Sequence, residues 1–82
     1  MKIGKKLLKE LSKKYAPSQT LDRKFGQYDL TLKTDEAGNA ILAFLGSRAE
    51  NGDIKGYRYV RTLVQDQQGQ VVKDHWDNHG KV

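Results

Sequence analysis

The first sixteen residues carry apolar side chains at helical spacing. At about 100° per residue, one stripe of a helix gathers most of them, and lysines fill the opposite side. The stripe comprises Ile3, Leu7, Leu8, Leu11 and Tyr15. Pro17 cannot continue a helix, so the pattern predicts a basic amphipathic helix over residues 1–16 and a connector over residues 17–24.

Four later runs are rich in β-branched and aromatic residues, and short polar turns separate them. These runs are 25–34, 40–48, 55–65 and 70–77. The links are too short for a parallel crossover, so neighbouring strands must be antiparallel. We therefore predict a single α+β domain over residues 1–82. Its N-terminal amphipathic helix packs on a four-stranded antiparallel β-meander (25–77), and residues 78–82 form a frayed tail.

Turn chemistry sets which side chains share a face of this meander. Asp35–Gly38 and Asp66–Gly69 have the Asp-x-x-Gly pattern of a type I turn followed by a left-handed glycine. Asn51-Gly52 is read as a two-residue turn. The resulting registers predict one face for the helix to cover, comprising Tyr28, Leu30, Leu32, Leu42, Phe44, Tyr57, Tyr59, Leu63 and Val71. An even-length first turn would instead move the apolar residues of run 25–34 to the other face.

The other face is also apolar in its middle, and one short helix cannot cover both faces. Its candidate contact residues are Ile41, Val60, Val64, Val72 and Trp76. Exposed apolar patches of several hundred Å² usually mark interaction sites. This face is therefore the predicted interface with a second copy or another protein. A sheet curled into a half-barrel would bury more of it internally.

Charge is concentrated at the N-terminus. Of the net +5, residues 1–24 carry +6 from eight bases and two acids, whereas the remaining residues carry −1 from seven bases and eight acids. The chain has no cysteine, which excludes disulfides and thiolate sites and fits a cytoplasmic protein. No apolar run is long enough for a membrane span or a secretory signal.

The lysine-rich helix face predicts contact with nucleic-acid phosphates, because clustered ammonium groups displace condensed counterions there. The candidate nucleic-acid-binding residues are Lys2, Lys5, Lys6, Lys9, Lys13, Arg61 and Lys73. The sheet tyrosines beside Arg61, Lys73 and His75 would suit stacking on single-stranded bases. The alternatives are a solvated helix face and tyrosines that belong to the core. Membrane docking is disfavoured, because the sheet needs the apolar stripe.

Catalytic and metal chemistry find little support in the sequence. Acids occur mostly in turns, and glycines are scattered and do not form a phosphate loop. His75, Asp77 and His79 alternate, but Asn78 and Gly80 suggest that the strand has already ended. We expect no enzyme, metal, cofactor or small-molecule substrate. The leading hypothesis is a non-enzymatic nucleic-acid-binding module, and the alternative is a protein-interaction or homodimerising module built around Trp76.

Overall fold

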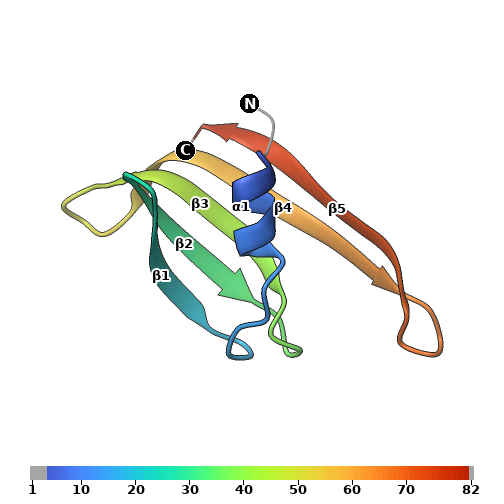
Figure 1. The fold of residues 1–82 in the computed structure, drawn as a ribbon. Coiled ribbons are helices and arrows are strands. Elements are labelled where there is room, and N and C mark those ends of the chain that lie inside the picture. The colour runs from blue at the N-terminus through green and yellow to red at the C-terminus, as the bar shows by residue number, and fades with distance from the viewer. Residues whose placement is uncertain (1–3, 82) are drawn as a thin grey trace.

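The computed structural model describes residues 4–81 as one short helix lying against a five-stranded antiparallel sheet (Figure 1). The helix is α1 (Lys5–Leu11). The strands are β1 (Thr20–Phe25), β2 (Tyr28–Thr34), β3 (Ala40–Arg48), β4 (Ile54–Gln65) and β5 (Val71–Lys81). They lie in the order β1-β2-β3-β4-β5. The antiparallel meander after a helix is confirmed, and the predicted number of four strands is wrong.

The additional strand is β1, which occupies most of the predicted connector 17–24. A two-residue turn separates β1 from β2, since Phe25 pairs with Tyr28 across Gly26 and Gln27. Gly26 has φ +60°, the conformation that a glycine supplies at the first central position of such a turn. The predicted strand 25–34 therefore contains a turn near its start. Leu21 and Phe25, which share one face of a strand, were the signal that the sequence offered for β1.

The helix is shorter than predicted, because it ends at Leu11 and not near residue 16. Beyond Leu11 the chain exchanges helical hydrogen bonds for bonds to the β2–β3 turn. The Tyr15 N–H donates to the Gly38 carbonyl at 2.8 Å, and Lys14 forms an isolated bridge with Asn39. The predicted contributions of Lys2 and Ile3 lie outside the described residues.

The two Asp-x-x-Gly turns adopt the same predicted conformation. In the first, the Asp35 carboxylate accepts the backbone N–H groups of Ala37 and Asn39 at 3.0 and 2.8 Å. In the second, Asp66 accepts the equivalent N–H groups two and four residues later at 3.0 and 2.9 Å. Each turn is followed by a register shift that leaves Ile41 and Val72 without Cα partners. These bulges were not predicted.

The middle turn is one residue longer than predicted. The Ala49 N–H donates to the Asp53 carbonyl at 2.7 Å, which closes a three-residue loop with Gly52 at φ +91°. The longer turn and the Ile41 bulge each shift the strand pairing by one residue, and the two shifts cancel between β2 and β4. The predicted common face of Leu30, Leu32, Tyr57 and Tyr59 is therefore confirmed. Among β2, β3 and β4, β3 is the strand that is inverted: Ala43 and Leu45 lie on the helix face, in place of Leu42 and Phe44.

The last strand also departs from its prediction. Tyr59 pairs with Asn78 and Tyr57 with Lys81, so residues 78–81 belong to β5 and not to a frayed tail. A further register shift between these pairs accommodates Gly80. Because Val72 is bulged, Trp76 pairs with Arg61 and packs against the core on the helix face. Its predicted place on the uncovered face is therefore wrong.

The core lies between α1 and one face of the sheet. It comprises Leu7, Leu11, Leu30, Leu32, Ala40, Ala43, Leu45 and Tyr59. Among residues 4–81, no element covers the opposite face, where Leu42, Phe44 and Val60 are half-buried. Within the same residues β1 pairs only with β2 and β5 only with β4, so the sheet is open.

Candidate nucleic-acid interface

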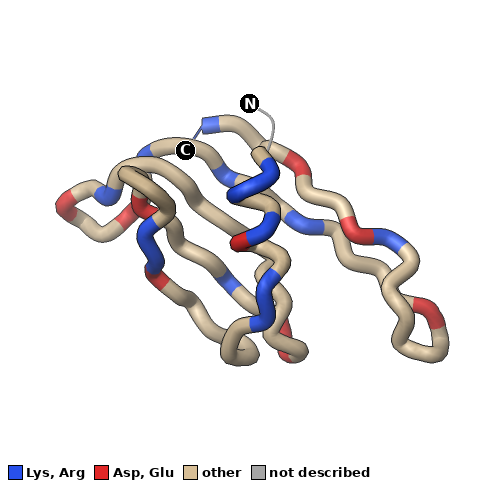
Figure 2. The backbone as a smooth tube through the Cα atoms, in the orientation of Figure 1, with Lys and Arg blue, Asp and Glu red and all other residues tan. Residues whose placement is uncertain are grey.

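Helix α1 presents three lysines to solvent because its other side is anchored in the core. Leu7 and Leu11 are buried, while Lys5, Lys6 and Lys9 are exposed. None of these three ammonium groups forms an ion pair within residues 4–81. Figure 2 shows their basic character along the helix. We call Lys5, Lys6 and Lys9 the α1 lysines.

Lys13 lies beside this group but already has an anionic partner. Its ammonium group donates to the Glu10 carboxylate at 2.9 Å. That hydrogen bond from Lys13 lowers the pKa of Glu10, and the Tyr15 hydroxyl contributes in the same direction. Beyond Lys13 the basic character continues through Lys14, and Arg23 on β1 lies over the Tyr15 ring at 5.8 Å. The α1 lysines are therefore more available to a ligand than Lys13.

Arg61, a predicted phosphate contact, is committed to the protein itself. Its side chain is only 7% exposed. Nε and Nη2 each donate to the Asp74 carboxylate at 2.6 Å, and Nη1 donates to the Ala40 carbonyl at 3.2 Å. The guanidinium also lies 5.7 Å from the centre of the Trp76 ring. Its hydrogen bonds lower the pKa of Asp74, as expected for a bidentate pair.

The structure does not bring the remaining predicted residues together with the α1 lysines. Lys73 pairs with Val64 on the uncovered face, away from the α1 lysines. Of the predicted partner contacts, Val60 and Val64 lie on that face, whereas Ile41 and Val72 lie at bulges. His75 and Asp77 contact each other at 2.8 Å, but residues 4–81 contain no group of three His, Asp or Glu side chains arranged for a metal ion.

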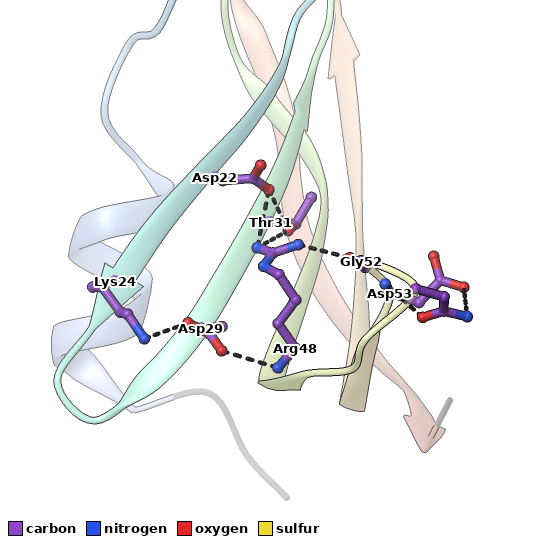
Figure 3. A network of polar contacts seen from close by, with 8 residues as sticks. Asp22, Lys24, Asp29, Thr31, Arg48, Gly52 and Asp53 are labelled. Carbon is purple, nitrogen blue, oxygen red and sulfur yellow. Dashed lines mark hydrogen bonds and ion pairs between the residues drawn. The ribbon is translucent and has the colours of Figure 1, made fainter.

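A polar network ties the β3–β4 turn to β1 and β2 (Figure 3). Arg48 Nη2 donates to Asp22 Oδ1 and Thr31 Oγ1, both at 3.0 Å, and its Nη1 donates to the Gly52 carbonyl at 2.7 Å. The Arg48 backbone N–H donates to Asp29. A cavity of about 520 Å³ beside this network is bordered by Asp22 and Asp53. Lys33, Arg48 and Lys55 also line this cavity, so it carries both signs of charge.

A second cavity, of about 670 Å³, lies between the first turn of α1 and the sheet. We call it the aromatic pocket. Its aromatic lining comes from β1, β2 and β4: Phe25, Tyr28, Tyr57 and Tyr59. Lys6 and Lys55 border it, and none of the described residues that line it is Asp or Glu. The sequence interpretation missed it because the lining residues are far apart in the chain and converge only in the folded sheet.

No protein family, curated protein or solved structure shows a significant match to this chain. Within residues 4–81, no helix has the length and apolar character needed to cross a membrane.

Proposed function

We propose that this protein is a non-enzymatic binding module whose α1 lysines contact the phosphates of a nucleic acid. The observation that supports this proposal is the density of available charge: three exposed lysines stand within five residues of a helix and form no ion pair with any residue between 4 and 81. The buried Leu7 and Leu11 hold that helix against the sheet, so the α1 lysines lie on its solvent-facing side. The alternative is that these lysines only keep a small protein in solution.

Substituting the α1 lysines is expected to abolish binding to nucleic acid. With three phosphate contacts, the logarithm of the association constant should fall with the logarithm of salt concentration with a slope of about −2 for single strands and about −3 for duplexes. Lys5→Glu/Lys6→Glu/Lys9→Glu should remove detectable association at low salt. Fluorescence anisotropy of a labelled oligonucleotide over a salt series measures both effects.

The matched control changes the same amount of charge on the uncovered face. Lys33, Arg58 and Lys73 are exposed there. Their triple substitution to Glu should retain most of the affinity, because it leaves the phosphate contacts in place. Equal loss in both triple variants would mean that only net charge matters. No association of the wild-type protein at low salt would refute the proposal.

A second candidate function is self-association through the end of the β4–β5 hairpin. The paired register of β3 and β4 stops at Leu42 and Val60, and the hairpin continues beyond it as a projecting ribbon (Figure 1). Val64, Val71 and Val72 there are 43%, 52% and 63% exposed. Isolated two-stranded ribbons are marginally stable in water, so contact with a second copy would stabilise this one. Trp76, on the helix face, no longer belongs to the proposed surface.

If self-association occurs through this ribbon, Val72→Glu should yield a monomer, because the added carboxylate would have to be desolvated at the contact. Sedimentation equilibrium over a wide concentration range measures the mass. Gln68→Glu, which adds the same charge in the exposed turn, should leave the mass unchanged. A wild-type protein that stays monomeric at every concentration contradicts this second candidate.

A further inference from the structure

The aromatic pocket differs from the rest of the surface in combining ring faces with cations. Phe25 and Tyr28 form a cross-strand pair beside the two-residue turn, and Tyr57 pairs with Leu45 farther across the same face. Tyr28 is 46% exposed, so its ring is accessible from solvent. Lys6 approaches from α1 and Lys55 from β4. The four elements thus direct aromatic surface and positive charge toward one space.

Three of the residues that line the pocket are glycines: Gly4, Gly46 and Gly56. No side chain from these residues fills the space between the helix and the sheet. The volume of about 670 Å³ lies within the range of about 300–1,000 Å³ typical of sites for small organic groups. Tyr59 also lines this pocket, and its hydroxyl is buried without a hydrogen-bond partner among residues 4–81.

We propose that the aromatic pocket receives an unpaired base of a single-stranded nucleic acid, with Lys6 and Lys55 beside the flanking phosphates. This inference rests on the proposed function, because it places the strand that the α1 lysines attract. Stacking on tyrosine and phenylalanine rings tolerates any base, since every base has a π face. The binding is therefore selective for single strands over duplexes and weakly selective for sequence.

The charge of the two cavities favours this occupant. The cavity beside Arg48 is lined by Asp22 and Asp53 as well as by Lys33, Arg48 and Lys55, so its two carboxylates oppose a phosphate that approaches these cations. The aromatic pocket has cations and no lining acid within the described residues, and Lys6 belongs both to the pocket and to the α1 lysines. A strand whose backbone follows the outer side of α1 can therefore place a base in the pocket without leaving the positive surface.

The test compares a single-stranded thymidine oligonucleotide with an abasic strand of the same length and charge. Wild-type protein should bind the base-bearing strand about 5- to 150-fold more tightly, the factor expected when one base stacks on aromatic rings. Tyr28→Ala should remove most of this preference and leave affinity for the abasic strand unchanged. Tyr28→Phe, which keeps the ring, should retain the preference.

Phe44→Ala is the matched control, because Phe44 is a half-buried aromatic residue on the uncovered face and borders the other cavity. Circular dichroism should verify that each variant is folded. Equal affinity of wild-type protein for both strands would overturn the pocket assignment while leaving phosphate contact intact. Full preference retained in Tyr28→Ala would also overturn it. Binding to neither strand would remove the proposed function itself, which separates the two failures.

Discussion

Leu30→Ala is expected to lower the free energy of unfolding by about 2–5 kcal/mol, the cost of deleting a buried leucine side chain and leaving a cavity. Leu30 is 0% exposed and belongs to the same buried cluster as Leu7 and Leu11 of the helix. A chain of this length should have a total stability of about 4–12 kcal/mol. The substitution therefore removes a large share of it and loosens the docking of α1.

Urea unfolding followed by circular dichroism measures this loss. Val64→Ala is the control, because Val64 is 43% exposed on the far side of the sheet and its removal should cost less than about 1 kcal/mol. Similar losses in the two variants would contradict the assignment of the helix to the Leu30 face. A loss confined to Leu30→Ala supports that face as the only one with a well-packed core.

Hydrophobic periodicity predicted most of the helix side of the core. Leu7 and Leu11 are buried at their predicted positions, and the exposed lysines follow because they lie opposite. Leu8, also part of the predicted stripe, is instead 44% exposed. Periodicity failed where both sides of a strand are apolar. In β3, Ala43 and Leu45 alternate with Leu42 and Phe44, so either face satisfies the pattern. The face then depends on counting turn and bulge residues, and one unpredicted residue inverts it.

The same limitation explains the errors at Arg61 and Trp76. The ion pair between Arg61 and Asp74 forms in the strand register that the Val72 bulge creates. Nothing in the local sequence predicts that bulge. With the bulge, Asp74 holds the guanidinium and Trp76 lies beneath it, so a residue predicted to bind phosphate becomes structural. The aromatic pocket was hidden for a related reason, because β1 and its turn were not recognised.

Gly46 provides the strictest requirement for one residue type in the sheet. It pairs with Gly56, and a Cβ on Gly46 would lie 2.0 Å from the Lys55 carbonyl oxygen and 2.8 Å from the Gly56 Cα. A Cβ on Gly56 would similarly lie 2.0 Å from the Leu45 carbonyl oxygen. These neighbours are backbone atoms, which cannot rotate away as a flexible side chain can. The two strands therefore need glycine at both positions to keep their observed approach.

Gly46→Ala is accordingly expected to cost about 3 kcal/mol or more, at or beyond the upper end of typical overpacking penalties, because β3 and β4 must separate locally. Hydrogen exchange should show faster opening at residues 47–55, and urea unfolding should show the lower stability. Gly4 lines the aromatic pocket, as Gly46 does, but a Cβ on Gly4 would meet no atom within 4 Å. Gly4→Ala should therefore change the free energy of unfolding by less than about 1 kcal/mol. If Gly46→Ala were as stable as Gly4→Ala, the close approach of β3 and β4 at this glycine pair would be incorrect. The Arg48 network would then lose its structural basis, because it depends on the position of the turn beyond that pair.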